Sequence, residues 1–155
     1  MIRRSLLGLA LLASVVAVPA VSAQAAAVAD SGIAATGAVM RVSLYRYVDG
    51  MQQAVLADMR THLIPTWEAQ RAAGILVNYA TMTNASPSSR DDWQFGIALT
   101  YKNWAALDSI GARTGPITLK HYGSAEARTA ALQARNKIRV LISSTLINAT
   151  SYARR

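Results

Sequence analysis

The sequence predicts an α+β domain whose elements follow the order β-α-β-β-α-β. Segments in which branched, aromatic and other apolar residues recur at every second position predict four strands. Two longer segments with apolar residues at steps of three or four positions predict helices, and a polar loop joins the two middle strands. The predicted strands are 41–48, 75–83, 93–101 and 139–149, and the predicted helices are 51–73 and 124–137.

Residues 1–23 have the pattern of a secretory signal peptide. A basic start at 1–4 precedes an apolar run at 6–21, and small residues at 21–23 have the spacing that a signal peptidase accepts. The run is shorter than the roughly 20 residues that span a bilayer, so we expect cleavage and no transmembrane segment afterwards. The expected product is periplasmic or secreted, with a flexible leader over 24–39 and one domain over 40–155.

The first helix carries the longest apolar stripe of the domain. The strand before it ends at Asp49–Gly50, and Gly74 can adopt the left-handed conformation that ends a helix. Pro65 cannot donate a backbone hydrogen bond to the carbonyl of Thr61, so we expect a kink there. The stripe that can pack on a sheet is formed by Leu56, Met59, Leu63 and Trp67.

The second half of the chain begins with a hairpin. Its loop at 84–92 is polar, and the strand that follows has one face of small residues around Gly96. We expect a bulky neighbour to lie close against that face. A short helix is expected over 103–112. Gly115–Pro116 then predict a break, which leaves His121 in a loop before the last helix.

This order of elements predicts the ferredoxin-like arrangement, an antiparallel sheet with helices on one face. The other face of the sheet is left bare, and the alternation of the strands makes it apolar or small. A bare apolar face needs a partner. We therefore expect two copies to close their sheets together into a homodimer, a dimeric α/β barrel.

Composition restricts the partners and the chemistry. The chain is 52% hydrophobic and 15% charged, which suggests a further buried surface such as a dimer interface or a ligand cleft. Its net charge of +8 is spread along the chain, whereas nucleic-acid binders concentrate theirs, so no nucleic-acid partner is expected. The chain has no cysteine and therefore no disulfide. No common nucleotide, zinc, thiol or hydrolase motif is present, so we expect no cofactor and no metal site.

Two stretches of the sequence resemble the dimeric α/β-barrel superfamily. One is the helical run 62–75, and the other is the run 91–108 from the third strand into the following helix. Within the superfamily, the chain is similar to antibiotic-biosynthesis monooxygenase-like and stress-responsive barrel domains, and to exported bacterial barrel proteins of unknown function. The similarity covers about residues 40–153. It implies the fold and a homodimer, but no single reaction.

The candidate site combines one histidine with polar aromatics and an arginine. His62 lies about 100° from Leu63 around the helix, where it can act as a base or bond locally as a helix-flank residue. Tyrosine and tryptophan suit aromatic-ligand clefts, but also cores and dimer interfaces. Arg46 shares an apolar strand face and needs either a protein carboxylate or an anionic ligand. The catalytic candidate is His62, and the ligand-binding candidates are Tyr45, Arg46, Tyr47, Trp67 and Tyr79.

The leading functional hypothesis is an exported homodimer that binds a small aromatic or amphipathic molecule between the helix 51–73 and the sheet. One alternative is a cofactor-free monooxygenase-like or isomerase-like enzyme that uses the same pocket. Another is a structural or interaction protein with a filled core and no ligand site. The sequence leaves open whether the protein is an enzyme.

Overall fold

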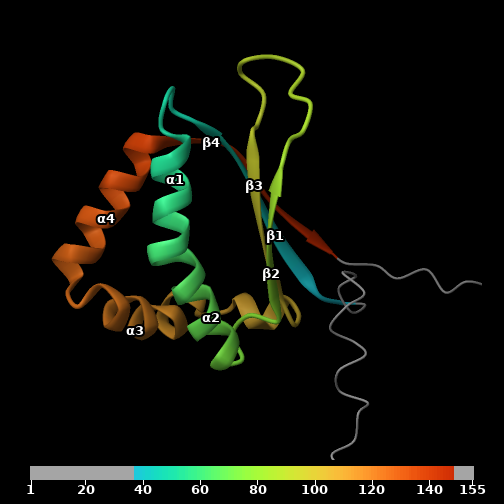
Figure 1. The fold of residues 1–155 in the computed structure, drawn as a ribbon. Coiled ribbons are helices and arrows are strands. Elements are labelled where there is room, and N and C mark those ends of the chain that lie inside the picture. The colour runs from blue at the N-terminus through green and yellow to red at the C-terminus, as the bar shows by residue number, and fades with distance from the viewer. Residues whose placement is uncertain (1–36, 149–155) are drawn as a thin grey trace, which may run out of the picture. The chain divides into compact units, whose positions relative to one another are not determined.

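A computed structural model describes residues 37–148. The predicted signal peptide, residues 24–36 of the predicted leader and residues 149–155 lie outside the described residues. The described chain forms a four-stranded antiparallel sheet with helices on one face (Figure 1). The strands are β1 (Val39–Tyr47), β2 (Asn78–Thr83), β3 (Phe95–Tyr101) and β4 (Arg139–Asn148). The helical elements are α1 (Gln52–Asp58), η1 (Met59–Leu63), α2 (Ile64–Ala72), η2 (Trp104–Leu107), α3 (Ile110–Tyr122) and α4 (Ala125–Ile138).

The sheet has the strand order β2-β3-β1-β4. Strand β1 lies in the middle and pairs antiparallel with both neighbours, so that Leu44 stands opposite Gly96 in β3 and Ser143 in β4. This arrangement is the ferredoxin-like topology, and it confirms the predicted fold class. The second helical connection, from β3 to β4, contains three helical elements, namely η2, α3 and α4.

Three strands begin at other residues than the sequence predicts, and among them β3 begins at Phe95 rather than at residue 93. Strand β1 begins at Val39, whose side chain is completely buried, so the folded domain starts slightly before the predicted position. Strand β2 begins at Asn78 rather than at residue 75. The backbone N–H groups of Ile75 and Leu76 both donate to the carbonyl of Gln70, which turns the chain from the helix towards the sheet. Both side chains are buried although they precede the strand.

The predicted helix 51–73 contains a wider turn immediately before Pro65. The five residues of η1 are π-helical, and Pro65 follows in the first turn of α2. In a regular helix each step of four residues overshoots a full turn by about 40°. The wider turn corrects this drift, which keeps Val55, Met59 and Trp67 on the sheet side. Val55, rather than the predicted Leu56, is the buried residue of the first turn.

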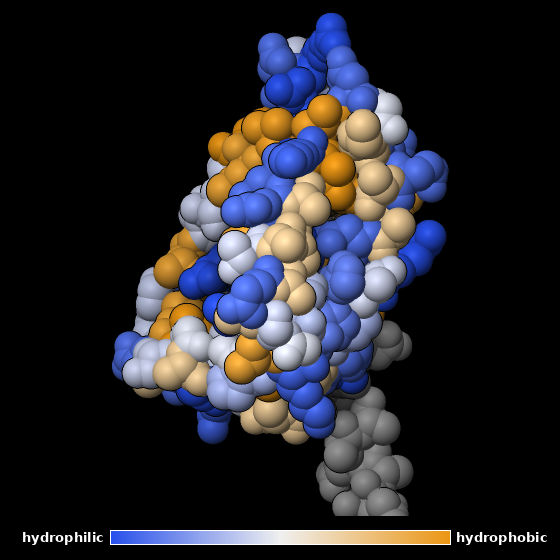
Figure 2. All heavy atoms as spheres, turned by 90° about the vertical axis from the view of Figure 1, so that its left-hand side faces the viewer, coloured by the Kyte–Doolittle hydropathy of each residue, from blue (hydrophilic) through white to orange (hydrophobic). Residues whose placement is uncertain are grey.

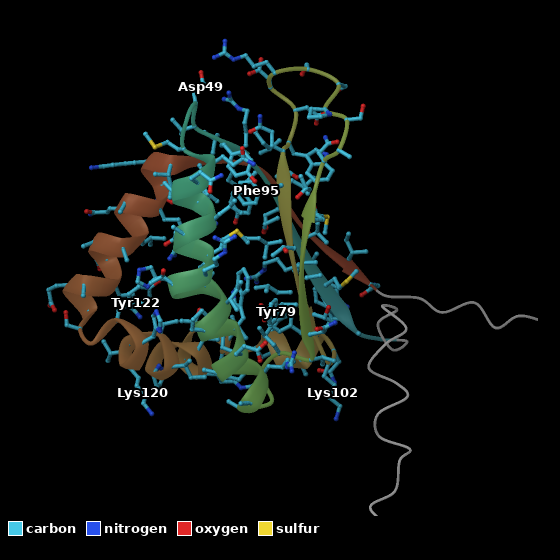
Figure 3. The ribbon with its side chains drawn as sticks, in the orientation of Figure 1. Asp49, Tyr79, Phe95, Lys102, Lys120 and Tyr122 are labelled. Atoms are coloured by element: carbon cyan, nitrogen blue, oxygen red, sulfur yellow. The ribbon has the colours of Figure 1, made fainter. Side chains whose placement is uncertain are left out.

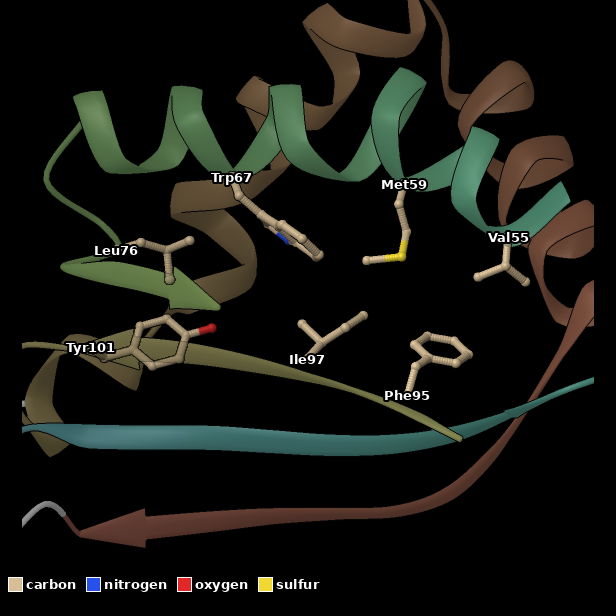
Figure 4. Close-up of a cluster of buried hydrophobic side chains, with 7 residues drawn as sticks. All are labelled: Val55, Met59, Trp67, Leu76, Phe95, Ile97 and Tyr101. Atoms are coloured by element: carbon tan, nitrogen blue, oxygen red, sulfur yellow. The ribbon is translucent and has the colours of Figure 1, made fainter. Parts of the chain in front are cut away.

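The hydrophobic core lies between the first helical segment and the sheet. Figure 4 shows side chains from α1, η1 and α2 meeting those of β3. Phe95, Ile97 and Tyr101 project from β3 towards the helices, and Trp67 projects down onto them. The seven buried members of this cluster are Val55, Met59, Trp67, Leu76, Phe95, Ile97 and Tyr101.

The predicted break at Gly115–Pro116 is wrong, because both residues lie inside α3. Pro116 deprives the helix of one backbone hydrogen bond. Threonine hydroxyls add side-chain hydrogen bonds to the backbone of α3. Thr114 donates to the carbonyl of Ile110 at 2.9 Å, and Thr118 donates to that of Gly115 at 2.9 Å. Packing of α3 against α2 outweighs the weak helix propensity of the Gly-Pro pair. His121 therefore stands in the last turn of a helix rather than in a loop.

The helix-free face of the sheet is built around Gly96. A Cβ atom at this position would lie 2.7 Å from Cγ of Met82 and 2.9 Å from Cδ2 of Leu44. The bulky neighbours expected from the small residues of this strand are thus side chains of the adjoining strands.

Among the helices within residues 37–148, none combines the length and the apolar character needed to cross a bilayer.

Candidate functional site: a histidine pair beside a pocket between α2 and α3

The two histidines of the chain meet between helices. His62 comes from η1 and His121 from the last turn of α3, and Nδ1 of His62 lies 3.0 Å from Nε2 of His121. Their rings are nearly perpendicular, with centroids 5.3 Å apart. One of the two facing nitrogens must donate and the other must accept, so this hydrogen bond requires that at least one ring be neutral.

Tyr122 packs against both imidazoles. Its ring centroid lies 5.1 Å from that of His62 and 4.8 Å from that of His121. Its hydroxyl accepts a hydrogen bond of 2.8 Å from Nη2 of Arg135. Figure 3 shows Tyr122 lying between α3, α4 and the first helical segment. The tyrosine therefore connects the histidine pair to the interior of the helical layer.

Arg135 is a buried cation that donates hydrogen bonds to Asp58 and Tyr122. Its guanidinium donates to both carboxylate oxygens of Asp58, at 2.6 and 3.0 Å, in the bidentate geometry that favours arginine. Burial acts to lower the pKa of Arg135, but the hydrogen bonds to Asp58 and Tyr122 outweigh it and raise that pKa above its ordinary value. Arg135 therefore stays charged and holds the Tyr122 hydroxyl in place.

A pocket of about 500 Å³ opens beside the histidine pair, between α2 and α3. Lys120 is at its edge, and Figure 3 shows this side chain extending from α3 into solvent. Figure 2 shows the helical side of the domain, where hydrophobic patches alternate with hydrophilic ones. The residues that line the pocket are Pro65, Thr66, Ala69, Ile117, Lys120 and His121.

Four of the predicted ligand-binding residues lie in the core or pack against it, and they do not line one common cleft. Tyr45 and Tyr47 stack on Phe95 with centroids 5.1 and 4.7 Å away, and burial raises the pKa of Tyr47. Trp67 is buried and its ring lies 5.2 Å from that of Tyr79. Core side chains fill the space between helix and sheet where the ligand was expected (Figure 4).

Tyr79 is held by a carboxylate of α2. Its hydroxyl donates to Oε1 of Glu68 at 2.6 Å, and this hydrogen bond, with burial, raises the pKa of Tyr79. Glu68 also forms an ion pair with Arg71 at 3.7 Å. The acidic group of this helix is therefore engaged away from the pocket that His121 lines.

Arg46 lies on the opposite, helix-free face of the sheet. Its Nη1 atom is 3.7 Å from a carboxylate oxygen of Asp91, and its side chain is 27% exposed. Its Nε atom is buried and has no hydrogen-bond partner within the described residues. The sequence left open whether Arg46 meets a carboxylate of the protein or an anionic ligand. In the structure the carboxylate of Asp91 is near it.

His62 is therefore separated from the other predicted site residues. It lies beside Leu63 as expected, but it faces α3 rather than the sheet. Sequence reasoning missed His121, Lys120 and Tyr122 because it ended the preceding helix too early. The signal in the sequence is the spacing of Ile110, Thr114, Ile117 and His121 at steps of three and four, and the structure shows that these residues form one half-buried helical face.

Imidazole nitrogens are common metal ligands, and the histidine pair brings two imidazoles together. Metal sites in proteins ordinarily use three or four protein ligands. Within residues 37–148, no group of three or more histidine, cysteine, aspartate or glutamate side chains is placed to hold a metal ion.

The fold and the site together define a ferredoxin-like α+β protein with a helix–helix pocket. No protein-family profile matches the sequence, and a search of curated proteins finds no relative. Solved structures of similar fold include a dimeric ferredoxin-like protein of unknown function from Bacteroides fragilis. It has 15% identity and a TM-score of 0.42, and the alignment covers 73% of this chain and 97% of that one.

Two further similar structures have functional or family names. A DABB family protein with a ferredoxin-like fold from Mesorhizobium loti has 12% identity and a TM-score of 0.43. The hydroxynitrile lyase from Passiflora edulis has 14% identity and a TM-score of 0.43. Each alignment covers 76% of this chain and 100% of the other. At these identities the likeness concerns the fold alone.

Proposed function

We propose that the protein is an exported homodimer that binds a small molecule in the pocket between α2 and α3. The observation that carries this proposal is a pocket of about 500 Å³ that is lined by His121, whose ring is hydrogen-bonded to His62. Pockets of this size, with mostly apolar walls and a few polar groups, are typical of small-molecule sites. The site predicted between helix and sheet is replaced by one on the other side of the same helix.

The pair gives the pocket an adaptable polar group. Nε2 of His121 is engaged by His62, which leaves Nδ1 of His121 as the nitrogen that can meet a ligand. When His62 donates within the pair, a neutral His121 carries a hydrogen on Nδ1; when His121 donates, its Nδ1 is an acceptor. A switch between these two arrangements of the pair can move a proton to or from a bound molecule. A cofactor-free enzyme, the alternative function, requires such a proton transfer.

Filling the pocket should weaken binding. Ala69 lines the pocket and is exposed, so the indole of Ala69→Trp will occupy the space a ligand needs. We expect a library of small aromatic and amphipathic compounds to shift the NMR signals of Ile117 and His121, and the variant to weaken this binding at least about tenfold. Ala72→Trp, at an exposed position of the same helix outside the pocket, is the matched control.

Unchanged binding by Ala69→Trp, or a library that shifts no signals around the pocket, would contradict the proposal. Chemical analysis of each bound compound after incubation separates binding from turnover. A product formed by the wild type but not by His62→Gln would identify an enzyme, whereas an unchanged compound favours a binding protein.

The proposal of a homodimer rests on two apolar surfaces, namely the helix-free face of the sheet and its edge strand β4. The outward residues Met40, Val42 and Leu44 of β1 stand beside Ile147, Thr145 and Ser143 of β4. Exposed large hydrophobic residues concentrate on β4, which leaves an apolar surface that a second copy would cover. These residues of β4 are Val140, Leu141, Ile142, Leu146 and Ile147, with exposures between 39% and 54%. Val140 and Ile147 pair with Arg46 and Met40 and so belong to the helix-free face.

A charge on this face should dissociate the dimer. Ile147 is 43% exposed and pairs with Met40, so Ile147→Asp would place an unpaired carboxylate in the interface. We expect the wild type to sediment as a dimer at micromolar concentration and this variant as a monomer. Leu132→Asp, at a 51% exposed position on α4, should remain dimeric. A wild-type monomer, or a dimer that Ile147→Asp leaves intact, would contradict the proposed interface.

A further inference from the structure

We propose that the ligand of the α2–α3 pocket is a small carboxylate with an apolar body, whose anionic end is held by Lys120 and His121. This inference rests on the proposed function and specifies the chemical class of the ligand. It follows from which polar groups of the pocket are free to bind and which are already engaged.

The walls of the pocket supply contacts for an apolar body. Pro65 and Ala69 come from α2, and Ile117 comes from the facing side of α3. Thr66 adds no free donor, because its hydroxyl donates to the backbone carbonyls of His62 at 3.0 Å and Leu63 at 2.8 Å. Its hydroxyl hydrogen is therefore used within the helix, and the α2 wall offers a ligand mainly carbon surface.

The donors that remain are at one end of the pocket. The ammonium group of Lys120 has three donors and no acceptor, and His121 can present Nδ1–H when its Nε2 accepts from His62. Lys120 and His121 are consecutive in α3 and both line the pocket, and Figure 3 shows the lysine side chain reaching solvent. A carboxylate is acceptor-only when ionised, so it can bind both groups at once.

Carboxylates of the protein do not compete for these donors. Among residues 37–148, no aspartate or glutamate lines the pocket. The acidic residues of α1 and α2 are engaged elsewhere: Asp58 by Arg135, and Glu68 by Tyr79 and Arg71. The pocket is therefore cationic at its rim and apolar along its walls, which favours an amphipathic anion over a neutral or cationic ligand.

The test compares a carboxylate with its uncharged isostere. 4-Phenylbutyrate and 4-phenylbutanamide have the same shape, and only the first is anionic. We expect NMR titration to show that the acid binds at the pocket residues about tenfold or more tightly than the amide, since a hydrogen bond to a charged group is the stronger kind. Lys120→Met should remove most of this preference while keeping the apolar contacts.

Lys102→Met is the matched control, because Lys102 is also an exposed lysine but lies outside the pocket. This variant should retain the full preference for the acid. Equal affinity for acid and amide would overturn the inference about charge and leave the binding pocket standing. Equal loss of preference in both lysine variants would show a general charge effect and also overturn it. If library compounds bind at the pocket and 4-phenylbutyrate does not, the inference fails while the proposed function survives.

Discussion

Arg135→Leu is expected to lower the free energy of unfolding by about 3–5 kcal/mol. The substitution leaves the carboxylate of Asp58, which is 14% exposed, without its bidentate partner. It also removes the donor that holds the Tyr122 hydroxyl. Urea denaturation followed by circular dichroism gives the free energy. The loss arises mainly because one charge stays buried and unpaired, and a second substitution can test that cause.

The double variant Arg135→Leu with Asp58→Leu removes both charges together. Because no buried charge is then left unpaired, it should be more stable than Arg135→Leu alone. Arg128→Leu, at an exposed position of the same helix, controls for the loss of an arginine and should change stability by less than about 0.5 kcal/mol. A double variant as unstable as the single one would show that Arg135 acts by packing rather than by neutralising Asp58.

Trp67→Ala is expected to cost about 3–5 kcal/mol of unfolding free energy. Trp67 is 6% exposed and packs with Tyr79 and the β3 side chains of the core. Removing the indole leaves a cavity that the surrounding sheet and helix cannot fully close. The same denaturation measurement shows the effect, and binding at the α2–α3 pocket provides a second readout, because Trp67 does not line that pocket.

Trp104→Ala is the matched control. Its indole is 51% exposed and donates to Asn148 at 2.8 Å, so its removal should cost far less than that of Trp67. A stable Trp67→Ala variant with impaired ligand binding would reverse the assignment. It would return Trp67 to the ligand-binding role that the sequence suggested and place the binding site between helix and sheet.

The prediction of the elements succeeded where a pattern is local. Alternation in 41–48 and 93–101 reports which side chains face the core, and the structure keeps both as strands. The small side chain at Gly96 likewise indicated close neighbours, which are Met82 and Leu44. The prediction failed at Gly115–Pro116, because these residues break helices in isolation but are tolerated here by the packing of α3 on α2.

For the candidate site, sequence reasoning found one half of a pair. His62 was recognised as a residue beside the core stripe, but its partner His121 is 59 positions away and was assigned to a loop. The aromatics were recognised as pocket markers, although a buried Trp67 and a stacked Tyr45 have the same sequence pattern whether they line a cleft or fill a core.

By itself the sequence determined the β-α-β-β-α-β order, and with it the ferredoxin-like topology and the bare sheet face, because periodicity within a segment fixes which side becomes buried. The tertiary structure alone decided that α3 continues through Pro116, that it packs on α2, and that Arg135 holds Tyr122 beneath the two histidines. These contacts join residues distant in the chain, and their energy comes from burial and pairing that no local pattern records.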